Sequence, residues 1–248
     1  MNVVVLNTFY AVILASFLAC LVTTIGIYII SKYEEWGNRN AAYFMSFAAG
    51  VLISVSFLHI IPKSLSMSSN APIYLLVGFL ALYAVNRYMN SYVCDERECE
   101  DLSIGIIPML GIGFHSFIDG IIYSVTFNVS IFTGTLAAVG MVLHEFPEGV
   151  VTFLLLERAG IERQKAIVYA FLAAALSTPL GALVSYPFIH DINPSILGIM
   201  LAASAGILVY VGASHLLPAV EKENQRYTII TLGVGIIVAF LIVLSKGS

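Results

Sequence analysis

Long apolar runs, separated by short polar turns, dominate the chain. A run of about 20 apolar residues is long enough to cross a bilayer as an α-helix. Eight candidate runs cover residues 7–30, 41–61, 72–92, 102–126, 133–156, 165–188, 194–217 and 227–245. Helices are favoured in lipid because they satisfy their backbone hydrogen bonds within one segment. The pattern predicts an all-α polytopic membrane protein with eight transmembrane helices in a single domain, residues 1–248.

The composition fits lipid, rather than water, as the main solvent. The 248 residues are 59% hydrophobic and 10% charged, and the mean hydropathy is +0.94. Soluble domains carry about 25% charged residues, so these few charges cannot build a water-facing surface. The eleven Lys and Arg residues form no basic stripe, and no nucleic-acid partner is expected. The expected surroundings are therefore the lipid bilayer.

The basic residues are distributed unevenly between the two sets of loops. Two of the eleven, Lys63 and Lys246, fall on one side of the membrane. The other nine are Lys32, Arg39, Arg87, Arg97, Arg158, Arg163, Lys165, Lys222 and Arg226. Because Lys and Arg in short loops face the cytoplasm, the crowded side is expected to be cytoplasmic and both termini to be outside. The expected location is a plasma membrane or a bacterial inner membrane.

The second and seventh spans contain similar sequences. One reads Ala49-Gly50-Val51-Leu52, six further residues, then His59-Ile60-Ile61-Pro62; the other reads Ala205-Gly206-Ile207-Leu208, six further residues, then His215-Leu216-Leu217-Pro218. These spans are five crossings apart, so they run in opposite directions. An inverted repeat is typical of transporters, because opposed halves can present one site to either face. Chance similarity between two apolar helices with a terminal proline is the alternative.

Ionisable side chains are concentrated in the fourth and fifth spans. They are His115 and Asp119 in the fourth span, and His144, Glu145 and Glu148 in the fifth. A charge in mid-helix costs roughly 2.5–3.5 kcal/mol on insertion scales, so such residues are functional candidates. Hydrogen bonding that simply joins helices is the alternative, but it poorly explains five clustered groups.

The spacing of these residues predicts that they converge. His115 and Asp119 are four residues apart, as are His144 and Glu148, so each pair shares a helix face. In an antiparallel hairpin of two helices, the residue numbers of any two residues at the same depth add up to the same total. The residue numbers of the span ends, 126 and 133, add up to 259, and so do those of His115 and His144. Both imidazoles should therefore lie about 16 Å below the hairpin end, near the midplane of a bilayer core about 30 Å thick.

The donor atoms favour a transition metal. Imidazole with carboxylate suits zinc and its first-row neighbours better than sodium or calcium. Ser116 could add a neutral oxygen, and neither span contains a cysteine whose thiolate would bind zinc too firmly for release. The ion, zinc or another divalent transition metal, is thus expected to be a transported substrate and not a cofactor.

Three prolines are expected to loosen the helices around this site. Pro108, Pro147 and Pro179 lie in the fourth, fifth and sixth spans. Each lacks the N–H that would complete a helical hydrogen bond, which leaves a backbone carbonyl free. Transporters use loosened helices at membrane depth to line an ion path with backbone oxygen.

Four further residues are candidates for the pathway or its cytoplasmic exit. His59 and His215 each lie near the end of a span, beside a proline, where a structural role is the alternative. Cys94 and Cys99 lie in the expected cytoplasmic loop 93–101, with five carboxylates in eight residues. That loop could hold a metal transiently, although a solvated acidic loop is the simpler interpretation.

Two motifs resemble the paired signature of the ZIP family of metal transporters. The fourth span contains His115-Ser116-Phe117-Ile118-Asp119-Gly120, and the fifth contains His144-Glu145-Phe146-Pro147-Glu148-Gly149. The eight spans and Pro179-Leu180-Gly181 extend the similarity over nearly the whole chain. The resemblance implies uptake of zinc, iron, manganese or cadmium toward the cytoplasm. It also implies an inverted-repeat bundle of three, two and three helices, and assembly as a homodimer.

The same resemblance implies roles for individual residues. A principal metal site would be formed by His115, His144 and Glu148, and a second site by Ser116, Glu145 and Glu148. Asp119 would lie near the pathway to the site. Several relatives have a glutamate where this chain has Thr178, and a neutral hydroxyl is a much weaker ligand. The second site is therefore expected to be weak or absent, and the transport cycle to use one metal ion.

An intramembrane zinc-dependent hydrolase is the main alternative. His144-Glu145 begins like the H-E-x-x-H motif of zinc proteases, in which the glutamate acts as general base. However, the fifth position is Glu148 instead of His, and Pro147 is expected to interrupt the helix. An enzyme also has no need of the two-faced access that an inverted repeat provides. The sequence therefore favours a transporter without enzymatic activity.

Overall fold

The structure is a computed structural model that describes residues 2–89, 96–189, 193–223 and 225–245. Helices occupy almost all of these residues, and no strand occurs among them. In chain order the α-helices are α1 (Asn2–Lys32), α2 (Glu34–Arg39), α3 (Ala41–Val55), α4 (Ile61–Met67), α5 (Ala71–Tyr88), α6 (Glu96–Val129), α7 (Ile131–Arg158), α8 (Arg163–Ala170), α9 (Ser177–Ser185), α10 (Pro194–Val211), α11 (Leu217–Glu221) and α12 (Thr228–Ser245).

Several of these elements join end to end into longer rods. Within the described residues, seven helical stretches are long and apolar enough to cross a membrane. They are Thr8–Lys32, Ala41–Met67, Ala71–Tyr88, Leu102–Val129, Ile131–Arg158, Arg163–Phe188 and Pro194–Glu221. A shorter apolar helix, Thr228–Leu244, follows them. The predicted all-helical, multi-pass membrane architecture is therefore confirmed.

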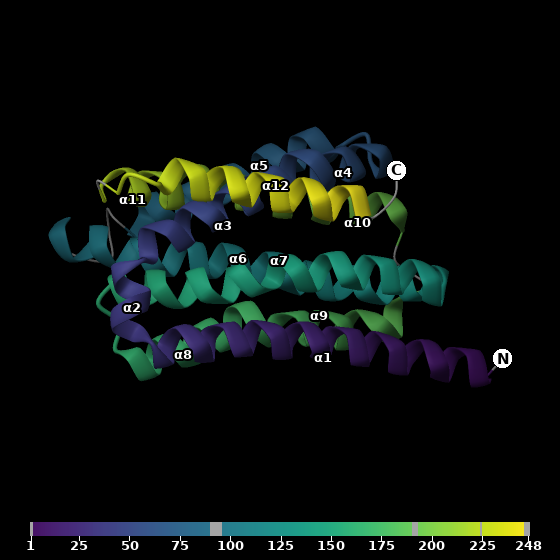
Figure 1. The fold of residues 1–248 in the computed structure, drawn as a ribbon. Coiled ribbons are helices and arrows are strands. Elements are labelled where there is room, and N and C mark those ends of the chain that lie inside the picture. The colour runs from purple at the N-terminus through teal and green to yellow at the C-terminus, as the bar shows by residue number, and fades with distance from the viewer. Residues whose placement is uncertain (1, 90–95, 190–192, 224, 246–248) are drawn as a thin grey trace.

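The hairpin of α6 and α7 lies in the middle of the bundle (Figure 1). On one side, α1 packs against α7, and α9 packs against α6. On the other side, α3 contacts α7 and α10 contacts α6, while α12 and α5 pack against α3 and α10 respectively. The central hairpin is thus covered on both sides by other helices, so its polar side chains can be shielded from lipid.

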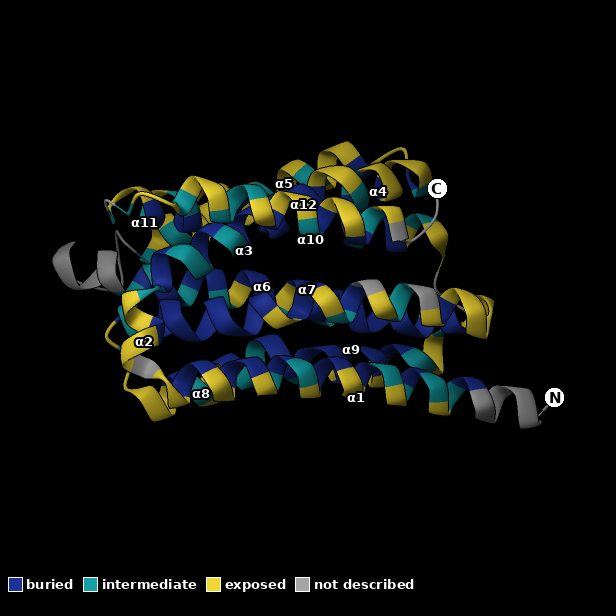
Figure 2. Ribbon diagram, in the orientation of Figure 1, coloured by how far each residue is buried: buried dark blue, intermediate teal, exposed yellow. Residues whose placement is uncertain are grey.

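Burial follows the same arrangement (Figure 2). Buried residues are concentrated along α6 and α7, whereas the outward faces of α1 and α12 are exposed. The exposed positions there are largely apolar; Leu14 on α1 and Ile229 on α12 are each 74% exposed. In water such surfaces would promote association. In a membrane they face hydrocarbon, as expected for a lipid-embedded bundle.

Helices α6 and α9 approach each other at the level of the polar cluster. A Cβ atom on Gly120 of α6 would overlap the carbonyl oxygen of Thr178, and one on Gly181 of α9 would overlap that of Phe117. Without side chains at these two positions the backbones can touch, as is common between membrane helices. This close contact brings Thr178 next to the hairpin.

Three π-helical turns interrupt the rods, and each precedes a proline. The turn before Pro179 agrees with the loosening expected of the sixth span, whereas the other two change the picture. The turns are η1 (Ser56–Ile60), η3 (Phe171–Ala175) and η5 (Gly212–Leu216). Pro62 and Pro218 do not end their spans as expected, because each falls in the first turn of the next helix, where no N–H is required. His59 and His215 are accordingly within continuous rods and not at span ends.

Pro108 and Pro147 also fail to break their helices, contrary to expectation. Both α6 and α7 continue through them. A membrane helix tolerates proline where neighbouring groups satisfy the freed carbonyl or where the local geometry adjusts. The loop expected at 93–101 is likewise shorter, because α6 begins at Glu96. Residues 93–95 lie outside the described part of the chain.

The contact between α6 and α9 generates a prediction about stability. Gly181→Ala places a methyl group against the Phe117 carbonyl, and overpacking of this kind typically costs about 1–3 kcal/mol. We expect a lower unfolding temperature for purified protein in detergent. Gly233→Ala on α12 is the matched control, since its new methyl group meets nothing within 4 Å. Equal unfolding temperatures for the two variants would contradict the close contact between α6 and α9.

Candidate metal centre

The two histidines of the central hairpin lie side by side. Ser130 alone separates α6 from α7, and its hydroxyl oxygen accepts a 3.0 Å hydrogen bond from the Thr133 amide. This cap starts α7 immediately after α6 and fixes the register of the hairpin. The ring centroids of His115 and His144 are 5.6 Å apart. The proximity expected from their equal depth is therefore observed.

His115, His144 and Glu148 form a cluster with the geometry of a metal site. Each offers one ligand atom, and these atoms all lie within 4.8 Å of one another. His115 Nε2 and Glu148 Oε1 are 3.6 Å apart. Two neighbouring ligands of tetrahedral zinc, each bonded at 2.0–2.1 Å, lie about 3.3 Å apart. All three residues are at least 97% buried, so a cation here would be enclosed by protein.

The two carboxylate oxygens of Glu148 have different environments. Ser116 Oγ, on α6, donates a 3.4 Å hydrogen bond to Oε2. Oε1, which faces His115, has no hydrogen-bond partner among the described residues. A buried polar atom without a partner costs about 1–3 kcal/mol, and more when it is charged. A metal ion bound to Oε1 would remove this penalty.

Asp119 lies between the two imidazoles. Its Oδ2 atom is 2.8 Å from His144 Nε2 and 3.5 Å from His115 Nε2. The carboxylate can therefore orient His144 and can also reach an ion held between the rings. The family resemblance implies a place near the pathway to the site for this residue, and its role there stays a prediction.

Glu145 lies next to His144 in the chain but is not among the three residues whose donor atoms converge. Thr178 Oγ1, from α9, donates a 3.2 Å hydrogen bond to its Oε1. Thr23 Oγ1, from α1, lies 3.4 Å from its Oε2, but the single proton of this hydroxyl has a nearer acceptor, the Ala19 carbonyl oxygen at 3.0 Å. Glu145, expected in the second site, is thus brought next to Thr178, which stands where several relatives have a glutamate.

Two hydroxyl groups that contact the cluster were missed by the sequence reasoning. Thr23 lies in the first apolar span and reaches Glu145. Ser204, in α10, lies 2.8 Å from His115 Nδ1. Both residues are fully buried. Their only signal in the sequence is a polar residue inside an apolar run, and membrane helices contain many such serines and threonines with purely local roles.

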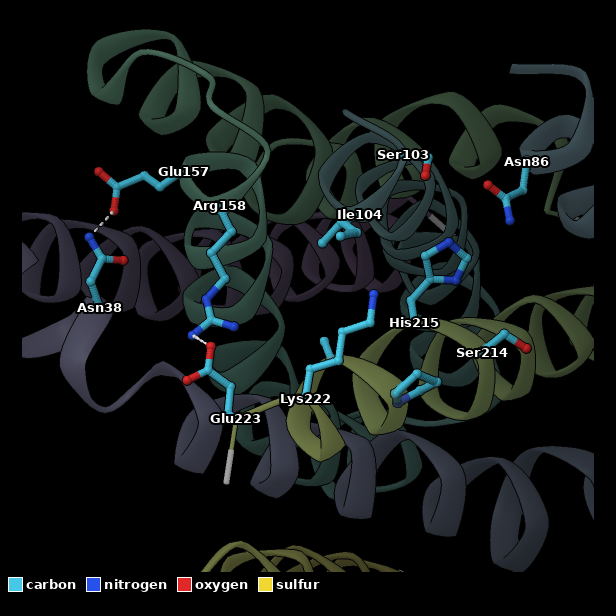
Figure 3. Close-up of a pocket in the computed structure, with 12 residues that line it drawn as sticks. Asn38, Asn86, Ser103, Ile104, Glu157, Arg158, Ser214, His215, Lys222 and Glu223 are labelled. Carbon is cyan, nitrogen blue, oxygen red and sulfur yellow. Dashed lines mark hydrogen bonds and ion pairs between the residues drawn. The ribbon is translucent and has the colours of Figure 1, made fainter. Parts of the chain in front are cut away.

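A separate cavity lies between the ends of α6, α7 and α11 (Figure 3). Its volume is about 610 Å³, and its lining includes Ser103, Glu157, Arg158, His215, Lys222 and Glu223. Arg158 Nη2 and Glu223 Oε1 form a 2.8 Å ion pair. His215 is 8% exposed, and its Nδ1 has no hydrogen-bond partner among the described residues.

The remaining candidates are not part of the group of three donor residues found among the described residues. His59 is half-buried in η1, in the rod formed by α3 and α4. Cys94 lies outside the described residues, and Cys99 falls in the first turns of α6. The buried grouping of metal ligands found in the described part of the chain is therefore the one in the α6–α7 hairpin.

Apolar helices that enclose two imidazoles and a carboxylate define an integral membrane protein that handles metal ions. Comparison with known proteins identifies its kind. The family model described as ZIP zinc transporter matches residues 6–102 and 94–243. The chain belongs to the ZIP zinc transporter family. It is a multi-pass membrane transporter of divalent metal ions and not an enzyme, and nothing supports the alternative of a hydrolase.

Individual relatives are similar over nearly their whole length. The zinc transporter ZupT of Chlorobium luteolum is 29% identical over 252 residues, which cover 91% of this chain and 94% of the relative. The zinc transporter ZupT of Clostridium perfringens is 25% identical over 264 residues, 90% of each protein. An uncharacterized protein of Methanocaldococcus jannaschii is 26% identical over 253 residues, 98% of this chain and 99% of the relative.

The unequal environments of the two glutamates generate a prediction about zinc binding. Glu148→Gln removes the charged oxygen that faces His115, so zinc affinity should fall by more than about 100-fold, beyond the 10–100-fold typical of groups that only support a ligand. Glu145→Gln should lower the affinity by less than about 10-fold, below the range typical of groups that support a ligand, because Glu145 is not among the converging donor atoms and an amide oxygen can still accept the hydrogen bond from Thr178. Titration calorimetry in detergent measures both. Equal losses of zinc affinity in the two variants would contradict the assignment of Glu148, and not Glu145, as a metal ligand.

Proposed function

We propose that this chain carries zinc toward the cytoplasm through a single site formed by His115, His144 and Glu148. The observation that supports it is the convergence of these three donors, within 4.8 Å, at a buried point between α6 and α7. A cation placed there would meet two neutral imidazoles and one anionic oxygen. This set binds zinc firmly enough to strip its water but lacks the thiolates that would hold it permanently.

Zinc is the favoured substrate, although the donor set accepts its neighbours. The relatives from Chlorobium and Clostridium carry the name zinc transporter. Imidazole and carboxylate also accommodate iron, manganese and cadmium, so competition among these ions is part of the proposal. The ion is a substrate that passes through the site, and no resident cofactor is required.

One ion for each cycle follows from the state of Glu145. A second metal beside the first would need its carboxylate, but Glu145 is not among the donor atoms that converge within 4.8 Å, and its hydrogen-bond partner on α9 is the neutral Thr178. Thr178 cannot supply the negative charge that a second divalent ion would require. Ser116 is likewise bonded to Glu148, where it orients the carboxylate of the principal site.

The proposed topology has eight crossings, with α12 as the eighth, and both termini outside. The uneven distribution of Lys and Arg supports this orientation. Support for an inverted repeat comes from the backbone, because η1 and η5 are separated by the same 156 positions as the repeated sequence. Together, the eight crossings and the inverted repeat give a bundle arranged as three, two and three helices. A C-terminal tag that only cytoplasmic reagents reach would contradict it.

The cavity lined by His215 is proposed as the exit to the cytoplasm. It lies at the ends of α7 and α11, beside Arg158 and Lys222, on the side expected to be cytoplasmic. His215 offers an unpaired imidazole nitrogen that could receive the departing ion. Zinc uptake that His215→Ala leaves unchanged would contradict this role. Assembly as a homodimer remains an expectation from the family resemblance.

Uptake of radioactive zinc into proteoliposomes tests the proposal. The unsubstituted protein should accumulate zinc, and both His144→Ala and Glu148→Ala should reduce uptake to the level of empty liposomes, because each removes a ligand. Thr135→Ala is a suitable control, since its exposed hydroxyl bonds only the Ile131 carbonyl in its own helix. Undiminished uptake by either ligand variant would place the site elsewhere.

A further inference from the structure

The two imidazoles of the metal cluster are held by different parts of the molecule. His144 Nε2 contacts Asp119 Oδ2 at 2.8 Å, within the α6–α7 hairpin. His115 Nδ1 instead contacts Ser204 Oγ at 2.8 Å, and Ser204 belongs to α10. Both partners of this contact are buried, at 2% and 0% exposure. The orientation of His115 thus depends on a helix that contributes no metal ligand.

We propose that Ser204 is a positioning residue for the metal site, which assigns α10 a part in metal binding. The proposal rests on the function proposed above. With Nδ1 held by Ser204, the opposite nitrogen of His115 points at Asp119 and Glu148, 3.5 Å and 3.6 Å away. Histidines that bind metals are typically fixed in this way through their second nitrogen, which sets both ring orientation and tautomer.

A hydroxyl group suits this position because it can both donate and accept a hydrogen bond. When a metal occupies Nε2, Nδ1 must carry the proton, and Ser204 accepts from it. When the metal has left, the proton can move to Nε2, which faces two carboxylates. Ser204 can then donate to Nδ1. The contact can therefore persist in both tautomers of His115, whereas a carboxylate or a carbonyl could hold only the tautomer with the proton on Nδ1.

The position of Ser204 is itself tightly fixed. The preceding residue, Ala203, presents its carbonyl to α5 so closely that a Cβ on Gly78 would overlap it. Helix α10 also contacts α6 directly. The close backbone contact with α5 on one side and the contact with α6 on the other place Ser204 in a packed part of the bundle. A rigid support of this kind is needed to hold a ligand within the narrow tolerance of a metal site.

Coupling between helix packing and zinc affinity follows from this arrangement. A change that separates α10 from α6 removes the support of His115 while leaving all the metal ligands in the hairpin. The zinc affinity of the site should fall without the loss of any ligand. The contact between α6 and α10 is thus a point at which a rearrangement of helices can weaken metal binding.

The test compares zinc affinities of purified variants by titration calorimetry. Ser204→Ala should weaken binding by about 10–100-fold, the effect typical of groups that support a metal ligand, and Ser204→Thr should restore much of it. Ser124→Ala is the matched control: Ser124 is equally buried, and its hydroxyl bonds the Ala182 carbonyl and not the metal cluster. Its affinity should stay within about 2-fold of the unsubstituted protein, as expected for a distant, independent site.

A double-mutant cycle separates positioning from a general structural effect. In a His115→Ala background, adding Ser204→Ala should change the affinity by less than about 2-fold, because the supported ring is gone. An equal loss in both backgrounds, or no loss in either, would overturn the proposal for Ser204. If His144→Ala and Glu148→Ala also failed to weaken binding, the proposed metal site itself would be wrong.

Discussion

The free-energy cost of placing ionisable groups inside an apolar bundle constrains the whole structure. Five such groups lie in one hairpin, and each is at least 97% buried. Charged side chains are expensive in hydrocarbon and persist where they pair with one another or serve an ion. The surrounding helices meet this constraint by covering α6 and α7 on both sides and by supplying hydroxyl groups from α1, α9 and α10.

The hydroxyl groups divide the cluster into two parts with different chemistry. Glu145 accepts a hydrogen bond from Thr178 and is not among the donor atoms that converge. Glu148 keeps one oxygen without a hydrogen-bond partner among the described residues, and that oxygen faces an imidazole. A cation would be stabilised more by the second arrangement than by the first. The proposed difference in role between two glutamates three residues apart rests on this contrast.

Local patterns made the fold and the core of the site predictable. Apolar runs gave the spans, and the sum of residue numbers correctly placed His115 beside His144, although the helices end and begin at Val129 and Ile131 and not at 126 and 133. The prediction holds because both helices extend by a similar length toward the connection. Thr23 and Ser204 were not predictable. Their contacts depend on which helices pack against the hairpin, and close approaches such as that at Gly181 become evident only in three dimensions.

The prolines show the limit of reasoning from one residue type. Pro147 was expected to interrupt its helix, but α7 continues through it. The backbone instead relaxes into π-helical turns next to Pro62 and Pro218, where the repeated histidines lie. Turns of this kind are frequent at functional sites. Whether a proline breaks a helix depends on the tertiary partners available to the freed carbonyl, which the sequence alone does not specify.

The identity of the atoms around bound zinc tests the central claim most directly. X-ray absorption at the zinc edge, measured on the loaded protein, should show nitrogen and oxygen neighbours at about 2.0–2.2 Å with the multiple-scattering pattern of imidazole. In His144→Ala the imidazole contribution should fall by half, because two histidines converge on the site. A shell of sulfur at about 2.3 Å, or an imidazole signal that His144→Ala leaves unchanged, would contradict the account.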